Sequence, residues 1–494
     1  SRMRVGALIV ALVLTPQIVV AWGLPQLRTA GSASLRSSPI RSENASSTEE
    51  KPVSKREMVK FLGPALGIFL ASPLMSNIDN AFVGRLSGTA GLAALSPGTV
   101  LSDQLLYLFS FLGRATTGIV ARANVDGPDA VREAIATPLT VALLIGAGLS
   151  IFYCTGTSFL LGVANVDPSL RSAAGAYVRI RGVVAWAVLA QSVCLSALLA
   201  TKDAVTPLKV VGVAALCNFI GDWLFCAWPL RLGPAGAAAA TAISTLVGCS
   251  LMVRALWSKK LLPWPLKTPS RRDLRALLEY AGPLSAIVVT RLAGFFYMAM
   301  TAASLGTASL AAYQICVNIF MFFVVFSEPL SQLAQTTLPP LIDRKDAALV
   351  RGTLKSLFVL MGGAALLVGG AAAGTIKLGA QTFSRDPAVL ALVRGTAFPA
   401  IFAATAQLIV TATIDGTNVA SKDFGFIMVF GTCTCAMQLM LLKHAVNSAA
   451  PLSFIFHTFT LRLALYAACS TLRSFCGFGP LGRLLRPRPV LKVA

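Results

Sequence analysis

Twelve apolar segments follow one another along this chain, and they limit its possible folds more than any other feature. Each segment is near or above the roughly 20 residues that an α-helix needs to cross a bilayer. The segments span 58–83, 92–120, 134–162, 172–200, 207–228, 235–257, 275–304, 309–338, 353–378, 389–417, 424–443 and 452–472. The sequence therefore predicts an all-α polytopic membrane protein with twelve transmembrane helices.

The composition supports a membrane location. Hydrophobic residues make up 55% of the chain and charged residues only 13%, which is too apolar a balance for a soluble globular protein. A net charge of +22 would suggest nucleic acid as the partner of a soluble chain. Here most Lys and Arg lie in loops and terminal regions, where they set the orientation of a membrane protein. We therefore expect membrane lipid around the chain, both termini on the more basic side, called here the cis side, and no nucleic-acid partner.

An internal repeat connects the two halves of the chain. Gly63-Pro64 recurs as Gly282-Pro283, and GTAGLAAL at 88–95 recurs as GTASLAAY at 306–313, at offsets of 219 and 218 residues. Duplicated units in membrane proteins are typical of two-lobed transporters, whose binding site lies between or within the lobes. We therefore predict two pseudo-symmetric six-helix bundles.

The repeat offset and the position of the basic residues predict where the lobes begin and end. We expect an N-lobe over 57–258, a basic linker over 259–274, a C-lobe over 275–472 and a basic tail over 473–494. The tail is expected to be a solvated extension or to lie on lipid headgroups.

The start of the chain has the composition of a targeting leader. Residues 1–21 hold an apolar run after Met3-Arg4 and small residues before Trp22, as a signal peptide does, and residues 22–56 are rich in Ser, Ala and Arg, as a transit peptide is. This order resembles the bipartite leaders of algae with secondary plastids, so we expect a plastid-envelope location and otherwise another endomembrane or the plasma membrane. An additional transmembrane anchor with a disordered linker is the alternative.

Ionisable and amide side chains inside the predicted spans are the best candidates for function, because each is costly in lipid unless it faces protein or water. Gly, Ala, Ser and Thr in the spans are expected to mark close helix packing instead. The costly residues are Asp79, Arg114, Arg179, Arg181, Asn218 and Asp222 in the first lobe, and Arg291, Gln314, Asn318, Glu328 and Asp415 in the second.

Three polar residues of the first lobe can form one cluster. Asn218 and Asp222 lie at positions i and i+4, so they face one side of the fifth predicted helix. The first and fifth helices cross in the same direction, and Asp79 lies at a depth similar to that of Asp222. Two carboxylates held close together repel each other, and a bound proton relieves the repulsion, as a proton carrier requires. A purely structural role for each acid is the alternative.

In the second lobe, Arg291 and Glu328 lie at nearly matching depth on adjacent antiparallel helices. We expect a structural ion pair between these helices, because loss of either partner would strand a charge in a low-dielectric surrounding. The alternative is a cation that attracts an anionic substrate.

Residues for metal or redox chemistry are sparse. The ten cysteines are scattered among the apolar segments, and the two histidines, His444 and His457, have no partner at metal-ligand spacing. A membrane-bound enzyme would need a clustered nucleophile, metal ligands or a soluble catalytic domain, and the longest loop is too short to fold alone. We therefore expect no metal site, no cofactor and no enzymatic activity.

Several motifs within residues 57–472 carry a family resemblance. They are PLMSNID (73–79), LAALSPGTV (92–100), YVRIRG (177–182), TKDAVTPLK (201–209), NFIGD (218–222), YQIC (313–316), SEPLSQLAQTTLP (327–339) and DGTNVASKDF (415–424). Together they resemble the multidrug and toxic compound extrusion (MATE) family of cation-coupled antiporters. PLMSNID, LAALSPGTV and SEPLSQLAQ are closer to the plant plastid-envelope branch, which agrees with the leader.

The resemblance implies a V-shaped pair of helical bundles that opens its cavity to either side of the membrane in turn. It implies that Asp79, Asn218 and Asp222 form the cation or proton site. The predicted substrate cavity comprises Gln314, Asn318, Glu328, Asp415 and Arg291. The plant branch tends to carry Glu where Asp415 stands, so a substrate contact of this shorter acid does not follow directly.

We expect a secondary active antiporter that exports an organic solute, an aromatic acid or other organic anion or a xenobiotic, in exchange for H⁺ or Na⁺ by alternating access. We expect it to act as a monomer. A lipid or lipid-linked oligosaccharide flippase of the same superfamily is the alternative, favoured if Arg114, Arg179 and Arg181 line the cavity.

Overall fold

The computed structural model describes residues 55–486, apart from 87, 165, 228–229, 267, 384–385 and 449. The predicted signal peptide, nearly all of the predicted transit segment and the end of the predicted tail lie outside the described residues. Within the described residues every regular element is a helix and no strand occurs. The predicted all-α class is therefore confirmed.

The first half of the chain folds into one bundle. Its elements are α2 (Lys55–Leu86), α3 (Gly88–Tyr107), α4 (Phe111–Ala123), α5 (Pro128–Val163), α6 (Arg171–Val183), α7 (Ala185–Ala200), α8 (Val205–Asp222), the π-helical turn η1 (Trp223–Ala227) and α9 (Pro234–Ser258). The pairs α3 and α4, and α6 and α7, are each two parts of one passage, and η1 extends α8. The bundle therefore has six passages.

The second half forms a second bundle with the same number of passages. Its elements are α10 (Arg271–Ser304), α11 (Thr307–Val324), α12 (Ser327–Asp343), α13 (Ala347–Phe383), α14 (Pro387–Ile409), the π-helical turn η2 (Val410–Asp415), α15 (Gly416–Ala420), α16 (Phe424–Asn447), α17 (Leu452–Phe475) and the short α18 (Gly479–Leu485). Here α11 and α12 form one passage, and α14, η2 and α15 form another.

Ten of the described helical stretches are long and apolar enough to cross a membrane, and α6 with α7, bent by 49°, gives an eleventh. The remaining predicted span, 92–120, corresponds to α3 and α4, which turns at residues 108–110 separate. Asp103 and Arg114 lower the hydropathy of this passage. All twelve predicted spans are thus helical in the structure.

The pseudo-symmetry predicted from the repeat is visible in where helices break. The second passage is broken in both lobes, between α3 and α4 and between α11 and α12, and so is the fourth, between α6 and α7 and at η2. In the second copy of the repeated GTA motif, Gly306 precedes α11 as its N-cap, and its φ of +113° is a backbone conformation that favours glycine. The two lobes therefore share helix geometry as well as sequence.

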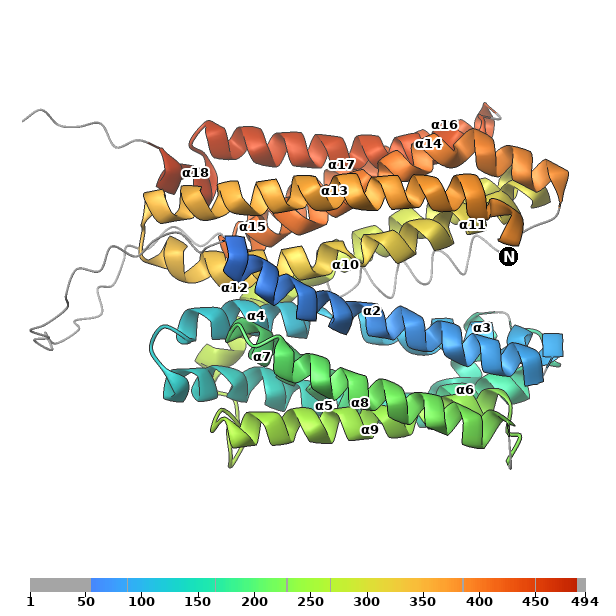
Figure 1. The fold of residues 1–494 in the computed structure, drawn as a ribbon, viewed down its shortest axis with the longest axis horizontal. Helices are drawn as coiled ribbons and strands as arrows, with labels where there is room; N and C mark the ends of the chain where they lie inside the picture. The colour runs from blue at the N-terminus through green and yellow to red at the C-terminus, as the bar shows by residue number, and fades with distance from the viewer. Residues whose placement is uncertain are drawn as a thin grey trace, which may run out of the picture. The chain divides into compact units, whose positions relative to one another are not determined.

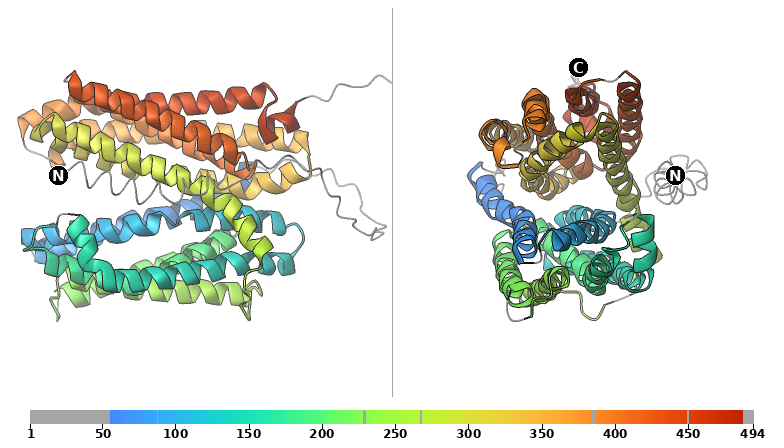
Figure 2. Two further views of the ribbon diagram at one scale, coloured as in Figure 1. Left: turned by 180° about the vertical axis from the view of Figure 1, so that it is seen from behind. Right: turned by 90° about the vertical axis from the view of Figure 1, so that its right-hand side faces the viewer.

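Each lobe has its own apolar core. Figure 1 shows α2–α9 grouped below α10–α17, and the end-on view of Figure 2 separates the two groups. Leu112, Tyr153 and Leu198 are fully buried in the first core. The second core is richer in aromatic residues, with the Phe320 and Phe459 rings edge to face at 5.6 Å.

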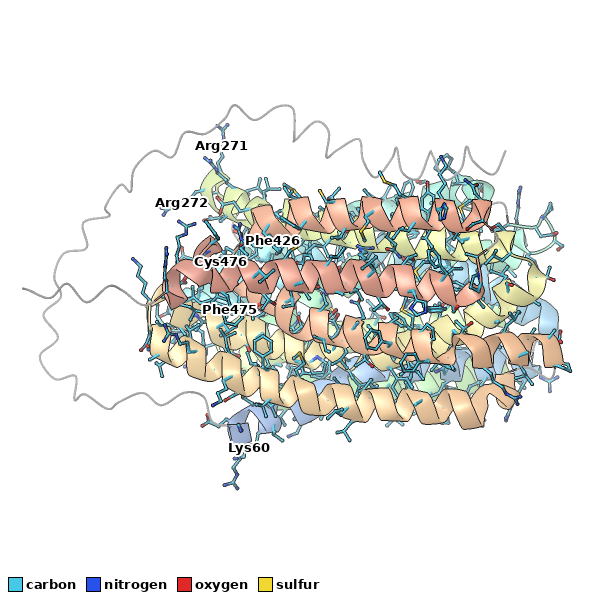
Figure 3. The ribbon with its side chains drawn as sticks, turned by 90° about the horizontal axis from the view of Figure 1, so that it is seen from above. Lys60, Arg271, Arg272, Phe426, Phe475 and Cys476 are labelled. Carbon is cyan, nitrogen blue, oxygen red and sulfur yellow. The ribbon has the colours of Figure 1, made fainter. Side chains whose placement is uncertain are left out.

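The lobes meet at the end of the bundle where α2 begins and α17 ends. There α4 packs against both α10 and α12, and Leu277 and Val419 of the second lobe join the apolar core of the first. Figure 3 shows Lys60, Arg271 and Arg272 at the same end as Phe475. This is the end that the loop charges mark as the cis side.

Candidate functional site

The three polar residues predicted to cluster in the first lobe lie together in the structure. The Asn218 amide on α8 donates one hydrogen bond to Asp79 Oδ1 on α2, at 2.8 Å, and another to Asp222 Oδ2, at 3.0 Å. Asp79 is 8% exposed and Asp222 is fully buried. One side-chain amide therefore bridges two buried carboxylates, and the predicted cluster is present.

Two hydroxyl groups on α9, which the sequence analysis missed, complete this first-lobe cluster. Thr241 Oγ1 lies 3.2 Å from Asp79 Oδ2 and 2.9 Å from the Ala237 carbonyl, so its single proton serves one acceptor at a time. Ser244 Oγ lies 3.3 Å from Asn218 Oδ1. The close approach of α8 and α9 makes this possible, since a Cβ on Gly221 would stand 2.8 Å from the Ala240 side chain.

The first-lobe cluster has a surplus of negative charge. No Lys, Arg or His is hydrogen-bonded or ion-paired to Asp79 or Asp222 within the described part of the chain. Asp222 Oδ1 is buried and has no hydrogen-bond partner among the described residues. Ionised carboxylates held this close repel each other. The arrangement can therefore take up a proton on the unpartnered oxygen, or a small cation among the surrounding oxygen atoms.

In the second lobe the prediction of an ion pair between Arg291 and Glu328 is wrong. Arg291 on α10 pairs with Asp415 on η2, while Glu328 on α12 pairs with Arg114 of the first lobe, whose Nη2 lies 3.3 Å from Glu328 Oε1. Equal depth on adjacent helices did not fix the direction in which the side chains point. A π-helical turn also holds an additional residue compared with an α-helical one, which shifts the register around Asp415.

The remaining predicted substrate-cavity residues lie elsewhere. Gln314 and Asn318 on α11 are exposed, and within the described contacts neither is hydrogen-bonded to the Arg291–Asp415 pair. The structure thus joins Arg291 to Asp415 and leaves Gln314, Asn318 and Glu328 outside that pair. Among the arginines considered for a flippase cavity, Arg114 is paired with Glu328, and Arg181 Nη2 lies 3.1 Å from Asp103 Oδ1.

The sequence analysis missed a second buried arginine of this lobe. Arg462 on α17 is 6% exposed, and its Nη1 donates to Gln438 Oε1 on α16 at 3.0 Å and to the Thr290 carbonyl at 3.4 Å. A cavity of about 40 Å³ is lined by residues that include Thr290, Arg291, Asp415, Thr434, Arg462 and Tyr466. The cost argument that selected Arg291 applies equally to Arg462, which lies within the last predicted span.

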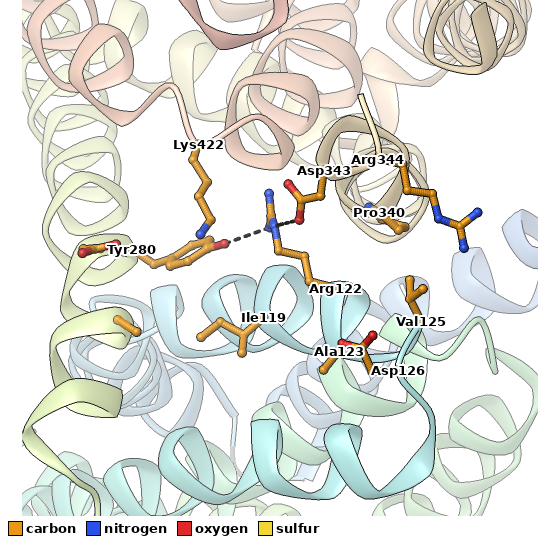
Figure 4. A pocket seen from close by; sticks show the side chains of 12 residues that line it. Ile119, Arg122, Ala123, Val125, Asp126, Tyr280, Pro340, Asp343, Arg344 and Lys422 are labelled. Atoms are coloured by element: carbon orange, nitrogen blue, oxygen red, sulfur yellow. Dashed lines mark hydrogen bonds and ion pairs between the residues drawn. The ribbon is translucent and has the colours of Figure 1, made fainter. Parts of the chain in front are cut away.

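A third polar group joins the lobes at the cis end. Arg122 on α4 contacts three elements of the second lobe: its Nε lies 2.8 Å from Asp343 Oδ2, its Nη1 is 2.9 Å from the Tyr280 hydroxyl, and its Nη2 is 2.7 Å from the Ala420 carbonyl. Figure 4 shows Arg122 between Tyr280 and Asp343. The Arg122 side chain thus connects α4 of the first lobe by hydrogen bonds to α10, α12 and α15 of the second.

A cavity of about 540 Å³ surrounds this cis junction, with Arg122, Arg344 and Lys422 among its lining residues. Lys422 lies in the turn after α15, with its Nζ 5.4 Å from the centre of the Tyr280 ring. Burial and then the neighbouring Arg122 guanidinium lower the pKa of Lys422. In this conformation the lobes are closed against each other at the cis end.

The described residues contain no cluster of the usual metal ligands. Their side chains form no group of three or more His, Cys, Asp or Glu residues that could hold a metal ion. The oxygen-rich cluster of Asp79, Asn218 and Asp222 remains the strongest candidate for binding an ion.

Comparison with known proteins gives consistent matches. The family model MatE matches residues 64–224, a range that holds Asp79, Asn218 and Asp222. Protein DETOXIFICATION 47, chloroplastic, from Arabidopsis thaliana is 32% identical over 385 residues, which cover 75% of this chain and 69% of that protein. Protein DETOXIFICATION 44, chloroplastic, from the same plant is 27% identical over 411 residues, covering 78% and 77%.

A solved structure shares the fold. A MATE protein crystallised in complex with MaD3S has a TM-score of 0.74 and 17% sequence identity, covering 85% of this chain and 96% of that one. At this identity the similarity concerns the fold alone, and it extends over both six-helix lobes.

Proposed function

We propose that this chain, which belongs to the MatE family of membrane transporters, is an antiporter that exports an organic solute in exchange for H⁺ or Na⁺ by alternating access. The similarity to the Arabidopsis protein, over more than two thirds of both chains, carries the family membership. As a member of the family, the chain is an integral membrane transporter for the efflux of small molecules. The coupling ion, the solute class, the monomeric state and the membrane are our proposals.

The observation that supports ion coupling is the surplus of carboxylates in the first lobe. Asp79 and Asp222 share one amide, and Asp222 Oδ1 lacks a partner among the described residues. A proton there would neutralise one acid and remove the repulsion between them. A Na⁺ ion would instead be coordinated by the oxygen atoms of Asp79, Asn218 and Asp222. Either ion draws α2 and α8 together when it binds.

This local change can reach the second lobe through α2. The helix packs against α8 through the cluster and against α12 of the other lobe. It also contains Pro64 and Pro73, each of which removes a backbone hydrogen bond and allows a helix to bend. Binding of an ion to the cluster therefore changes the position of a helix that touches both lobes.

Alternating access also requires the cis junction to open. In the described conformation Arg122 holds the lobes together at that end, so a solute on the cis side reaches the space between the lobes only after these bonds break. We propose that ion release from the first-lobe cluster and opening of the cis junction belong to the same transition.

The decisive experiment is transport by the purified protein in proteoliposomes. A pH gradient or a Na⁺ gradient is imposed separately, and uptake of a panel of aromatic acids and organic cations is measured. We expect one gradient to drive uphill movement of at least one solute, and a protonophore or a sodium ionophore to abolish it. Uptake that follows only the solute's own gradient, under both conditions, would refute ion coupling.

We propose that the membrane is a plastid envelope. Two relatives of this chain bear chloroplastic names, and residues 1–56 have the composition of a bipartite leader. Residues 1–56 fused to a fluorescent protein should reach the plastid of an algal host, and deletion of residues 22–56 should leave the fusion in the secretory route. Fluorescence of the intact leader in mitochondria or at the plasma membrane would contradict this location.

A further inference from the structure

The second lobe buries an arginine that has no carboxylate partner. Arg291 is neutralised by Asp415, but within the described residues no Asp or Glu lies within ion-pair distance of Arg462, which is 6% exposed. Its Nη1 bonds are to the neutral Gln438 side chain and to a backbone carbonyl. A buried cation without its own counter-charge is costly, and the two arginines that line this site have one carboxylate between them, that of Asp415, which is paired with Arg291.

The neighbouring Gln438 side chain also has an unused donor. Arginine can only donate hydrogen bonds, so the contact of Arg462 Nη1 fixes the oxygen of Gln438 toward the guanidinium and its NH₂ group away from it. Gln438 is fully buried, and its Nε2 has no partner among the described residues. The cluster therefore holds one buried donor on α16, Gln438 Nε2, that has no acceptor among the described residues.

The backbone makes room for this arrangement. Gly294 on α10 faces Arg462 and Gln438, and a Cβ there would stand 2.7 Å from Arg462 Nη1 and 3.1 Å from Gln438 Oε1. Beside them lies the cavity of about 40 Å³ that Arg291 and Arg462 both line. That is enough for a group of one or two water molecules in size, such as a halide ion or the carboxylate of a larger molecule.

The position in the fold matches that of the first-lobe cluster. Asp79, Asn218, Asp222 and Thr241 come from the first, fifth and sixth passages of their lobe, α2, α8 and α9. Arg291, Gln438 and Arg462 come from the first, fifth and sixth passages of theirs, α10, α16 and α17. The corresponding helices of the two lobes thus carry an excess of carboxylate groups in the first lobe and an excess of guanidinium groups in the second.

We propose that the second lobe contains an anion site in which Arg462 and Arg291 bind one singly charged group, supplied either by the carboxylate of the transported solute or by a free chloride ion. This inference rests on the proposed transport function and adds the charge of what the second lobe binds. Binding supplies the counter-charge that Arg462 lacks, and charge-assisted hydrogen bonds to a planar guanidinium suit a carboxylate.

Thermal unfolding of the purified full-length protein in detergent micelles tests the site without any ion gradient. The probes are sodium chloride, sodium benzoate and the neutral benzamide, each added to sodium isethionate, whose bulky anion carries no carboxylate, at constant ionic strength. A ligand that binds only the folded protein raises the apparent Tm in a dose-dependent manner. We expect a rise with chloride or benzoate and none with benzamide.

Two variants assign the effect to this site. Arg462→Gln should weaken the apparent affinity for the anion by at least about tenfold, because it removes charge-assisted bonds. Arg394→Gln, which removes an exposed cation from α14 of the same lobe, is the matched control and should leave affinity unchanged. If Arg462→Gln does not fold, Arg462→Lys, which keeps the charge but loses the planar fork, takes its place and should also bind more weakly.

The outcomes separate the sources and separate this proposal from the transport function. A rise with benzoate that exceeds the rise with chloride identifies the solute carboxylate as the ligand, and a rise with chloride alone identifies a bound halide. No rise with either anion, an equal rise with benzamide, or an undiminished rise in both Arg462 variants would overturn the anion site. Anion binding without gradient-driven transport would leave this site standing and refute only the proposed antiport.

Discussion

The buried polar clusters of the two lobes have the same location and opposite charge. In the first lobe, Asp79 and Asp222 share the amide of Asn218 and have no cation beside them among the described residues. In the second, Arg291 and Arg462 line one cavity with a single carboxylate, that of Asp415, which is paired with Arg291. Because the helices that carry them correspond, the repeat preserved a scaffold and changed the chemistry placed on it. Buried negative charge therefore gathers in one lobe and buried positive charge in the other.

The two clusters also differ in how they are held. The carboxylate cluster is bridged by neutral groups on short side chains from α8 and α9, so a proton or a small ion can enter and leave without breaking an ion pair. The guanidinium cluster contains one strong pair, Arg291–Asp415, next to Arg462, which forms no ion pair within the part of the chain that the structure describes. The arrangement in the first lobe suits reversible binding of a cation. The arrangement in the second lobe combines a fixed ion pair with the Arg462 guanidinium, which suits binding of an anion.

The largest effect is expected from removing the charge of the first-lobe cluster. Asp79→Asn and Asp222→Asn should each lower gradient-driven transport to the level of protein-free liposomes while the protein stays folded, because the amide resembles a protonated acid in shape and cannot lose the proton. Asp129→Asn, at an 86% exposed side chain of α5, is the control. Uphill transport at wild-type rates in both variants would move the coupling site out of the first lobe.

Breaking the Arg291–Asp415 ion pair of the second lobe should lower the stability of the folded protein. Arg291→Gln or Asp415→Asn alone leaves a buried charge without its partner, which costs about 3–5 kcal/mol, so we expect low expression and a low apparent Tm. The double variant, Arg291→Gln with Asp415→Asn, removes both charges and should recover part of the loss. Additive losses in this double-mutant cycle would show that the two side chains do not depend on each other.

A smaller effect on stability is expected at the cis junction, where Arg122 joins the two lobes. Arg122→Lys keeps the charge beside Asp343 but cannot reach Tyr280 and Ala420 as well, so about 1.5–3 kcal/mol of contact energy is lost. Hydrogen exchange should become faster at the ends of α4 and α12. Arg132→Lys on α5, where the arginine is 48% exposed, serves as the control. Unchanged exchange would mean that the apolar contacts alone hold the cis end closed.

The smallest effect tests the neutral groups of the first-lobe cluster. Thr241→Val removes a hydroxyl at nearly constant volume and should cost about 0.5–1.5 kcal/mol of ion affinity, measured as a higher ion concentration for half-maximal transport. Thr245→Val, one turn along α9, is a matched control, because among the described contacts that hydroxyl donates only to the Thr241 carbonyl. Equal kinetics in the two variants would exclude Thr241 from the ion site.

Much of the fold and one of the two clusters could be predicted from the sequence. Hydropathy and the repeat determine the helices and the two lobes, because a span must be apolar and about 20 residues long. Asp79, Asn218 and Asp222 could be placed together because i and i+4 positions share a helix face, and parallel passages put equal depth side by side. The spans and this cluster could be predicted because both depend only on how far each residue lies along its helix axis, which the sequence gives directly.

The partners of the arginines were decided by the tertiary structure alone. Arg291 and Glu328 have the expected depth, yet Arg291 turns to Asp415 and Glu328 turns across the lobe boundary to Arg114. Rotation about each helix axis, and the register shift at the π-helical turn η2, choose among partners of similar depth. The contacts of Thr241 with Asp79 and of Arg462 with Gln438 likewise depend on how three helices pack, because no spacing in the sequence relates residues on α2 and α9 or on α16 and α17.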